Sequence, residues 1–292
     1  MFWFKKEKIE PYSEIPRKDA TPLEALYISE EMKKDLLSVR NVFFALIMQL
    51  YRKEYINFEK LSTGEHNIVV SYEAVDSFNS NYRKVMEDNS CFDEMDENFQ
   101  NYVGGFYNGI MKMTENSTGL MEELEIGYDE LAMLNLLKAV SYECNGIVTF
   151  KSIADTILKR SKRKVDNFYI ETLIFIMNKV LTKSMIEKGF LFETELEDKK
   201  ILDIKNYPEK YIMESKLWKG LKKHLWENFI DIMQNDKLLL EFYPYYIVFD
   251  IDGRIVENID LEEVYLKPKT IVLLKALNEE TEALRKLEFE DE

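Results

Sequence analysis

Two stretches of this sequence run from apolar helical periodicity into a short hairpin pattern, and this repeated order constrains the fold more than any single motif. In the first stretch, helices are predicted from Thr21-Pro22 and over about residues 38–54. Alternating apolar and polar residues 56–61 and the β-branched residues 67–73 then predict two paired strands. Helices followed by a hairpin are the element order of a winged helix.

The second stretch repeats this order in fuller form. Its final helix is the most apolar in the chain, and Gly189 is well placed as a C-terminal stop. The elements expected are a helix from Tyr128, a short strand over 147–150, a helix over about 152–159, a helix over about 166–188, and a hairpin from residues 190–193 and 200–203.

The sequence therefore predicts an α+β, mostly helical protein with two winged-helix-like modules in tandem, followed by a helical C-terminal segment. That last segment is expected to hold a helix over about 214–235, a Tyr-Pro-Tyr-Tyr stretch, strands and an acidic tail. The predicted divisions are a leader at 1–20, the first module at 21–78, an acidic helical connection at 79–127, the second module at 128–205 and the C-terminal segment at 206–292.

The formal net charge of the 292 residues is -15, which disfavours nucleic acid and anionic lipid as partners and favours a basic protein. One basic run opposes this trend between the second and third helices of the second module. It suits either phosphate contacts in a DNA-binding regulator or a solvated turn beside an acidic neighbour. The run consists of Lys159, Arg160, Lys162, Arg163 and Lys164.

Two cysteines without paired spacing and no apolar run of about 20 residues predict a cytoplasmic protein without a membrane span. The N-terminal aromatics Phe2, Trp3 and Phe4, followed by lysines, suit either peripheral contact with a membrane interface or packing on the protein body. We therefore expect a cytoplasmic location, with membrane-peripheral contact as the alternative.

No catalytic, cofactor or metal site is predicted. His66 and His224 lack cysteine or histidine neighbours at ligand spacing, and the ten glycines form no phosphate-binding loop. The aromatic region that contains Trp218, Tyr243 and Tyr245 is typical of either a core or a partner interface.

Three stretches together resemble the C-terminal cytosolic portion of the YciQ-like predicted membrane proteins, a family of uncharacterised function. They are the proline-anchored entry at residues 14–16 and 21–25, the unit at 128–190 ending in Lys-Gly-Phe, and the Trp218 helix followed by the Phe-Tyr-Pro-Tyr segment at 242–245. The chain departs from the family in lacking membrane-spanning segments and in having Tyr246 where a small residue is expected. The resemblance implies a cytosolic part standing alone, and it lends no catalytic residue.

The function expected from these observations is non-catalytic protein docking. One form of this hypothesis places the docking at the inner face of a membrane. The alternative is a DNA-binding winged-helix regulator that uses the turn at 159–164, and an enzyme whose site assembles only in the fold comes third. The candidate interaction residues are the five cations of that turn together with Trp218, Tyr243 and Tyr245. The oligomeric state is not predicted.

Overall fold

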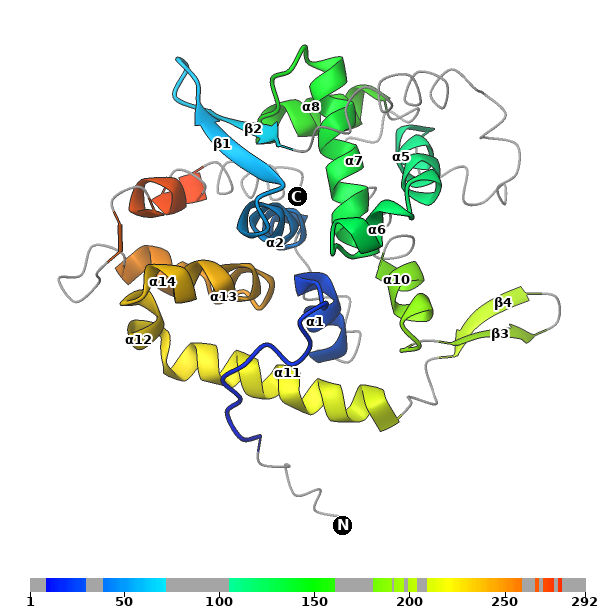
Figure 1. The fold of residues 1–292 in the computed structure, drawn as a ribbon, viewed down its shortest axis with the longest axis vertical. Coiled ribbons are helices and arrows are strands. Elements are labelled where there is room, and N and C mark those ends of the chain that lie inside the picture. The colour runs from blue at the N-terminus through cyan, green and yellow to red at the C-terminus, as the bar shows by residue number, and fades with distance from the viewer. Residues whose placement is uncertain are drawn as a thin grey trace, which may run out of the picture.

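The computed structural model of the chain describes residues 9–29, 39–71, 105–160, 181–190, 192–196, 199–203, 209–258, 266–267, 270–275 and 278–279. These residues form helices around one apolar core, with two separate two-stranded antiparallel sheets (Figure 1). The prediction of a mostly helical α+β fold is confirmed. None of the described helices is long and apolar enough to cross a membrane.

The first two predicted helices are confirmed as α1 (Pro22–Ser29) and α2 (Val39–Arg52). Thr21 caps α1, because its hydroxyl accepts a hydrogen bond from the backbone N–H of Glu24. The Glu24 side chain does not complete a capping box. It points instead to basic residues described below.

Both predicted hairpins are also present. β1 (Ile56–Lys60) pairs antiparallel with β2 (His66–Val70), and β3 (Phe192–Leu196) pairs antiparallel with β4 (Lys199–Asp203). The two hairpins lie on opposite sides of the molecule in Figure 1, with β3 and β4 extending past α10.

The middle of the chain supplies a central helix, α7 (Tyr128–Glu143), which confirms the predicted helix from Tyr128. It packs against α2, against α5 (Gly105–Asn116), against α8 (Phe150–Arg160) and against α10 (Thr182–Glu187). The short helix α6 (Leu120–Glu123) lies between α5 and α7 in the chain. Gly189 follows α10 with φ of +72°, as expected of a helix stop.

The strand predicted over residues 147–150 is wrong. Thr149 and Ser152 cap each other, because each hydroxyl accepts a hydrogen bond from the other residue's backbone N–H, and α8 therefore begins at Phe150. Residues 147–149 have no regular secondary structure. The carbonyl of Val148 accepts a 2.7 Å hydrogen bond from the N–H of Ile68 in β2.

All the secondary-structure elements described in the C-terminal segment are helices, so the strands expected there are not found in that part. The predicted helix over 214–235 is in fact two helices, α11 (Glu209–Glu227) and α12 (Phe229–Met233). The Tyr-Pro-Tyr-Tyr stretch lies inside α13 (Asp236–Val248), and α14 (Gly253–Asn258) follows. A proline inside a helix costs about 3 kcal/mol, and the burial of the tyrosines around Pro244 offsets this cost.

The apolar core is shared by segments on both sides of the predicted boundaries at residues 78 and 206. α2 packs along α13, and α1 packs along α11, which runs beneath it in Figure 1. The Ile68–Val148 hydrogen bond likewise joins the first hairpin to the residues that precede α8. One continuous cluster of buried side chains results.

Candidate functional site

Three predicted interaction residues lie in the core. Trp218 and Tyr245 stack with ring centroids 5.6 Å apart, and Tyr243 meets the ring of Phe44 edge-on. All three predicted residues have no exposed surface. Their polar groups point inward: the indole N–H of Trp218, for example, donates to the carboxylate of Glu214. Of the two interpretations of this aromatic region, a core or a partner interface, these three residues agree with the core. They offer no surface to a partner.

Most of the basic run lies outside the described residues. Lys159 and Arg160 belong to the last turn of α8, but their side chains and residues 161–164 lie outside what the structure describes. Phe2, Trp3 and Phe4 also lie outside it. The DNA contact and the membrane contact assigned to these residues stay predictions.

An exposed apolar face exists elsewhere, on the N-terminal half of α11. Ile212, Met213 and Leu217 expose 49%, 62% and 37% of their surface, although the helix buries Trp218 on its opposite side and Leu221 one turn after Leu217. Met213 and Leu217 are four residues apart and so stack one turn above the other. We call these three side chains the α11 apolar face. Exposed large apolar side chains on an otherwise packed helix are characteristic of a contact surface.

The backbone of the chain's own N-terminal segment already covers the next turn of α11. The N–H of Tyr12 donates to the carbonyl of Gly220 across 3.1 Å, and a Cβ on Gly220 would lie 2.7 Å from the carbonyl oxygen of Glu10. Only glycine permits this approach. Lys223 fixes the same segment by donating to the carbonyl of Ile9. The segment crosses in front of α11 in Figure 1.

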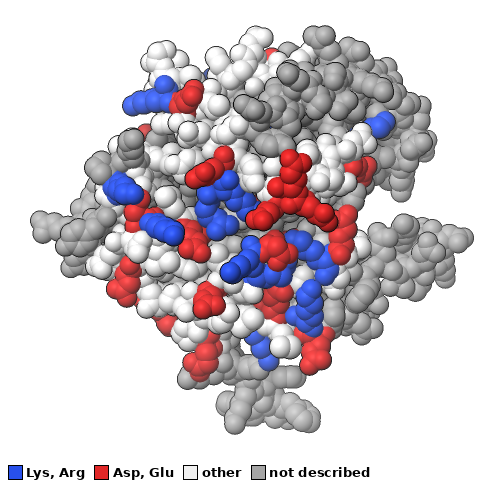
Figure 2. Space-filling model, in the orientation of Figure 1, with Lys and Arg blue, Asp and Glu red and all other residues white. Residues whose placement is uncertain are grey.

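Lysines surround the α11 apolar face. Lys210 and Lys216 are exposed and Lys219 is half-buried, whereas the acidic Glu214 of the same stretch is buried against Arg17. Positive and negative side chains are mixed over this side of the molecule in Figure 2. Glu209 in the first turn of α11 is also exposed, so close to the α11 apolar face three lysines stand against one exposed carboxylate, although the whole chain is strongly acidic.

A buried network of charged side chains ties α1 to α10 and α11. Glu24 has no exposed surface, and its two carboxylate oxygens accept from Lys188 (2.7 Å), Ser184 (2.6 Å) and Arg17 (2.6 Å). Arg17 also donates to Glu214 across 3.0 Å. Burial lowers the pKa of the Arg17 guanidinium, but Glu24 and Glu214 outweigh this effect and hold the pKa above its usual value. Because Glu214 lies on α11, the network helps to hold the part of this helix that carries the α11 apolar face.

A second acidic pair lies at the start of α7. Glu130 accepts from the N–H of Gly127 (2.6 Å) and pairs with Lys53 (2.9 Å), while Asp129 accepts from the hydroxyl of Thr21. Complete burial, with the nearby carboxylates Glu24 and Glu130, raises the pKa of Asp129 to about 7. Buried carboxylates of this kind serve as general acids in some enzymes, but these are occupied by structural partners.

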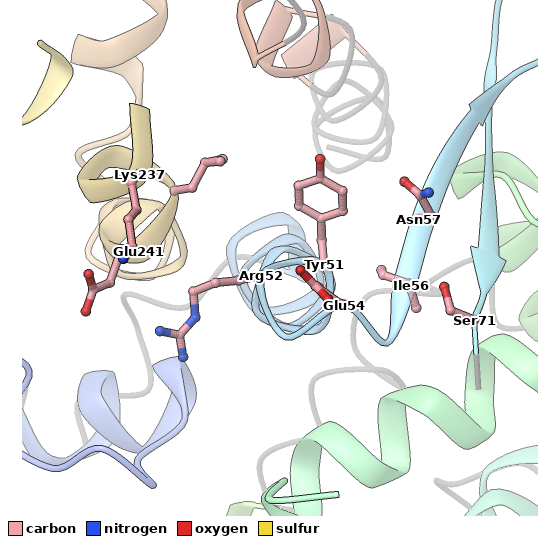
Figure 3. Close-up of a pocket in the computed structure, with 9 residues that line it drawn as sticks. Tyr51, Arg52, Glu54, Ile56, Asn57, Ser71, Lys237 and Glu241 are labelled. Atoms are coloured by element: carbon pink, nitrogen blue, oxygen red, sulfur yellow. The ribbon is translucent and has the colours of Figure 1, made fainter. Parts of the chain in front are cut away.

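A pocket of about 860 Å³ lies around the C-terminal end of α2 (Figure 3). The end of α2, the start of β1 and the first half of α13 form its walls. The lining residues are Tyr51, Arg52, Glu54, Ile56, Asn57, Ser71, Lys237, Leu240 and Glu241. Nothing in the sequence indicated this site, because its residues match no motif. The first and last of them, Tyr51 and Glu241, are 190 positions apart.

The α11 apolar face was also missed, although one signal was present. Apolar residues on α11 occur all around the helix, at 212, 213 and 217 as well as at the buried positions 211, 218, 221 and 225. A helix that needs only one face for the core and is apolar on others is a candidate for a contact.

Within the described residues, no three or more His, Cys, Asp or Glu side chains are grouped to hold a metal ion. No protein-family model matches the chain, and searches of curated proteins and of solved structures found no match. The resemblance to the YciQ-like proteins therefore stays a prediction.

Proposed function

We propose that this chain is a non-catalytic protein-docking module whose contact surface is the α11 apolar face. The observation that carries the proposal is the exposure of Ile212, Met213 and Leu217 on a helix whose opposite side is anchored in the core. Burial of a large apolar side chain contributes about 1.5–3 kcal/mol. Two or three such anchors are the number that dominates a typical interface.

The helix that carries the face is held rigidly, which favours binding because little ordering is needed. Trp218 stacks on Tyr245 beneath the face, and Glu214 is bound by both Arg17 and the Trp218 indole. Met213, with its flexible thioether, is suited to pack against side chains of varied shape.

The partner that fits best is an amphipathic segment with apolar anchors flanked by carboxylates. Lys210, Lys216 and Lys219 lie around the three anchors, and charge complementarity across a contact fixes orientation and raises the association rate. The net charge of -15 favours a basic partner at long range, but the charges that touch the partner are those of α11. We therefore propose an acidic contact segment.

The two helix–hairpin units support the finer proposal that the chain contains winged-helix-like modules, which are used for docking as well as for DNA binding. The hairpins β1–β2 and β3–β4 each follow helices in the predicted order. The DNA-binding alternative depends on the run at 159–164, and docking at an inner membrane face depends on residues 2–4.

Site-specific photo-crosslinking tests the proposal. A photo-reactive phenylalanine analogue replaces Met213, the full chain is irradiated in native lysate with and without nuclease, and the adduct is mapped by mass spectrometry. The matched control carries the same analogue at Val272, which is exposed to a similar degree (57%) but lies outside α11. We expect a nuclease-resistant protein adduct at position 213 alone, mapping to an acidic, amphipathic segment.

Three results contradict docking at this face. They are equal adducts at both positions, an adduct with nucleic acid that nuclease removes, and an adduct with lipid. The second result supports the DNA-binding alternative, and the third supports a role at a membrane surface.

A further inference from the structure

The pocket at the end of α2 contains an arginine that has no counter-ion among the described residues. The Nε of Arg52 is buried and has no hydrogen-bond partner, and no ion pair or side-chain hydrogen bond joins the guanidinium to any described residue. A guanidinium presents five N–H donors, and leaving a buried one unmatched is costly. The last turn of α2 favours a positive charge through the helix dipole, but that effect supplies no acceptor to Nε.

A second cation lines the same pocket from a different element. Lys237 lies in the first turn of α13, and none of the described residues forms an ion pair or side-chain hydrogen bond with its ammonium group. The residue is exposed at the mouth-lining position that it takes on α13. Two cations from distant parts of the chain thus line one cavity without visible counter-ions.

The carboxylates of the lining do not neutralise these cations. Glu54 and Glu241 both line the pocket, yet neither lies within ion-pair distance of a described basic side chain. Figure 3 shows the Arg52 guanidinium and the Glu241 carboxylate on the same side of α2, with Tyr51 and Glu54 on the other. The basic and acidic side chains that line the pocket are therefore not paired with one another. A ligand with both an acidic group and hydrogen-bond donors can bind to both kinds of side chain.

The remaining walls suit an organic ligand. The volume of about 860 Å³ is within the range of about 300–1,000 Å³ that small-molecule sites occupy. Ile56 and Leu240 are apolar, and the ring of Tyr51 leans on Phe58 with centroids 5.3 Å apart, so one face of the cavity is apolar and aromatic. Asn57 and Ser71 add hydrogen-bonding groups.

We infer that this pocket binds a small organic oxyanion, with Arg52 and Lys237 holding its carboxylate or phosphate group. Arginine matches both groups through paired N–H donors, and lysine adds a second positive charge. Glu54 and Glu241 disfavour highly charged anions and favour ligands that also carry donor groups. The site is separate from the α11 apolar face and the inference does not depend on docking.

The test is an NMR titration of the full chain with malonate and, separately, with inorganic phosphate, at constant ionic strength. The Arg52 Nε–H and the Ile56 methyl resonances are observed, because one reports the anion and the other the cavity. We expect both to shift and to saturate together with one of the two anions, which also assigns the site to carboxylates or to phosphates. Shifts that grow linearly without saturation, or a silent Arg52 Nε–H, would overturn the inference.

Variants separate the pocket from general charge effects. Lys237→Gln is expected to weaken binding about tenfold, the loss for one charge-assisted hydrogen bond. Lys267→Gln removes an exposed lysine that pairs with Asp236 and does not line the pocket, and it is expected to leave binding unchanged. Met213→Asp is expected to leave it unchanged as well. Equal losses in Lys237→Gln and Lys267→Gln would contradict a built site.

Discussion

The guanidinium of Arg17 lies 2.6 Å from the carboxylate of Glu24, a residue without any exposed surface, and it reaches Glu214 of α11 at the same time. This arginine therefore connects the start of α1 to the helix that carries the α11 apolar face. Because buried charges are stable only when paired, the network behaves as one unit. The first prediction concerns this unit.

Replacing Glu24 by glutamine is expected to lower the free energy of unfolding by about 3–5 kcal/mol, since it leaves the charges of Arg17 and Lys188 without their buried partner. Urea unfolding measures the change. Asp19→Asn is the matched control: Asp19 also pairs with Arg17, but its side chain is 66% exposed, so its loss is expected to cost about 1 kcal/mol or less. Equal effects of the two substitutions would contradict the network.

Stability is expected to depend on pH through Asp129. The pKa of Asp129 is raised to about 7 in the folded state, so between about pH 4 and pH 7 the folded state binds more protons than the unfolded state. The contribution of Asp129 to stability is thus fully present below about pH 4, declines as the pH rises to 7, and is constant above it.

Comparison with Asp129→Asn checks this dependence. We expect the unfolding free energy of the wild type, relative to this variant, to fall between pH 5 and pH 7 by up to about 1.4 kcal/mol per pH unit and to level off by pH 8. The control is Asp19→Asn, because Arg17 and Lys188 outweigh partial burial and lower the pKa of Asp19. Its difference from the wild type is expected to be flat over this range. A flat difference for Asp129→Asn would show that Asp129 stays ionised.

Gly127→Ala is expected to destabilise the start of α7. A Cβ on Gly127 would lie 2.7 Å from the Thr21 methyl and 2.9 Å from the Asp129 carboxylate, and overpacking of this kind costs about 1–3 kcal/mol. Gly119→Ala is the control, because nothing lies within 4 Å of its added Cβ and its backbone is helical. It is expected to be neutral or stabilising by about 0.4–1 kcal/mol. Thermal unfolding distinguishes the two outcomes.

Gly220→Ala is expected to release residues 9–12 from α11 without unfolding the core. The added Cβ would lie 2.7 Å from the carbonyl oxygen of Glu10, which is backbone and cannot move aside alone. Hydrogen exchange at the Tyr12 amide, which bonds to the Gly220 carbonyl, is expected to accelerate, while exchange in α7 stays unchanged. Unchanged protection of the Tyr12 amide would mean that the segment is held by other contacts.

Local patterns predicted local structure well in this chain. Thr21-Pro22 marked the start of α1, Gly189 marked a helix end, and alternation predicted β1. The strand predicted over residues 147–150 failed for a reason that is also local. Residues 147–149 have β-branched character, but reciprocal capping by Thr149 and Ser152 begins a helix there instead.

The candidate sites were less predictable, because each depends on what the fold covers. The sequence cannot distinguish Trp218, which is buried, from Met213, which is exposed, since both are apolar residues on one helix. Arg52 and Lys237 are ordinary surface residue types, and only the packing of α2 on α13 brings them to one cavity. Glu24 stands three residues after the cap Thr21, the capping-box position, but it is the centre of a long-range charge network.

The most direct test of docking at α11 is the affinity of the partner identified by crosslinking for the Met213→Asp/Leu217→Asp double variant, measured by fluorescence anisotropy. Both residues are exposed, so the unfolding free energy should stay within about 0.5 kcal/mol of the wild type. Loss of two anchors worth about 2 kcal/mol or more is expected to weaken binding at least about thirtyfold, whereas Val272→Asp leaves it unchanged. An affinity equal to that of the wild type would contradict the account.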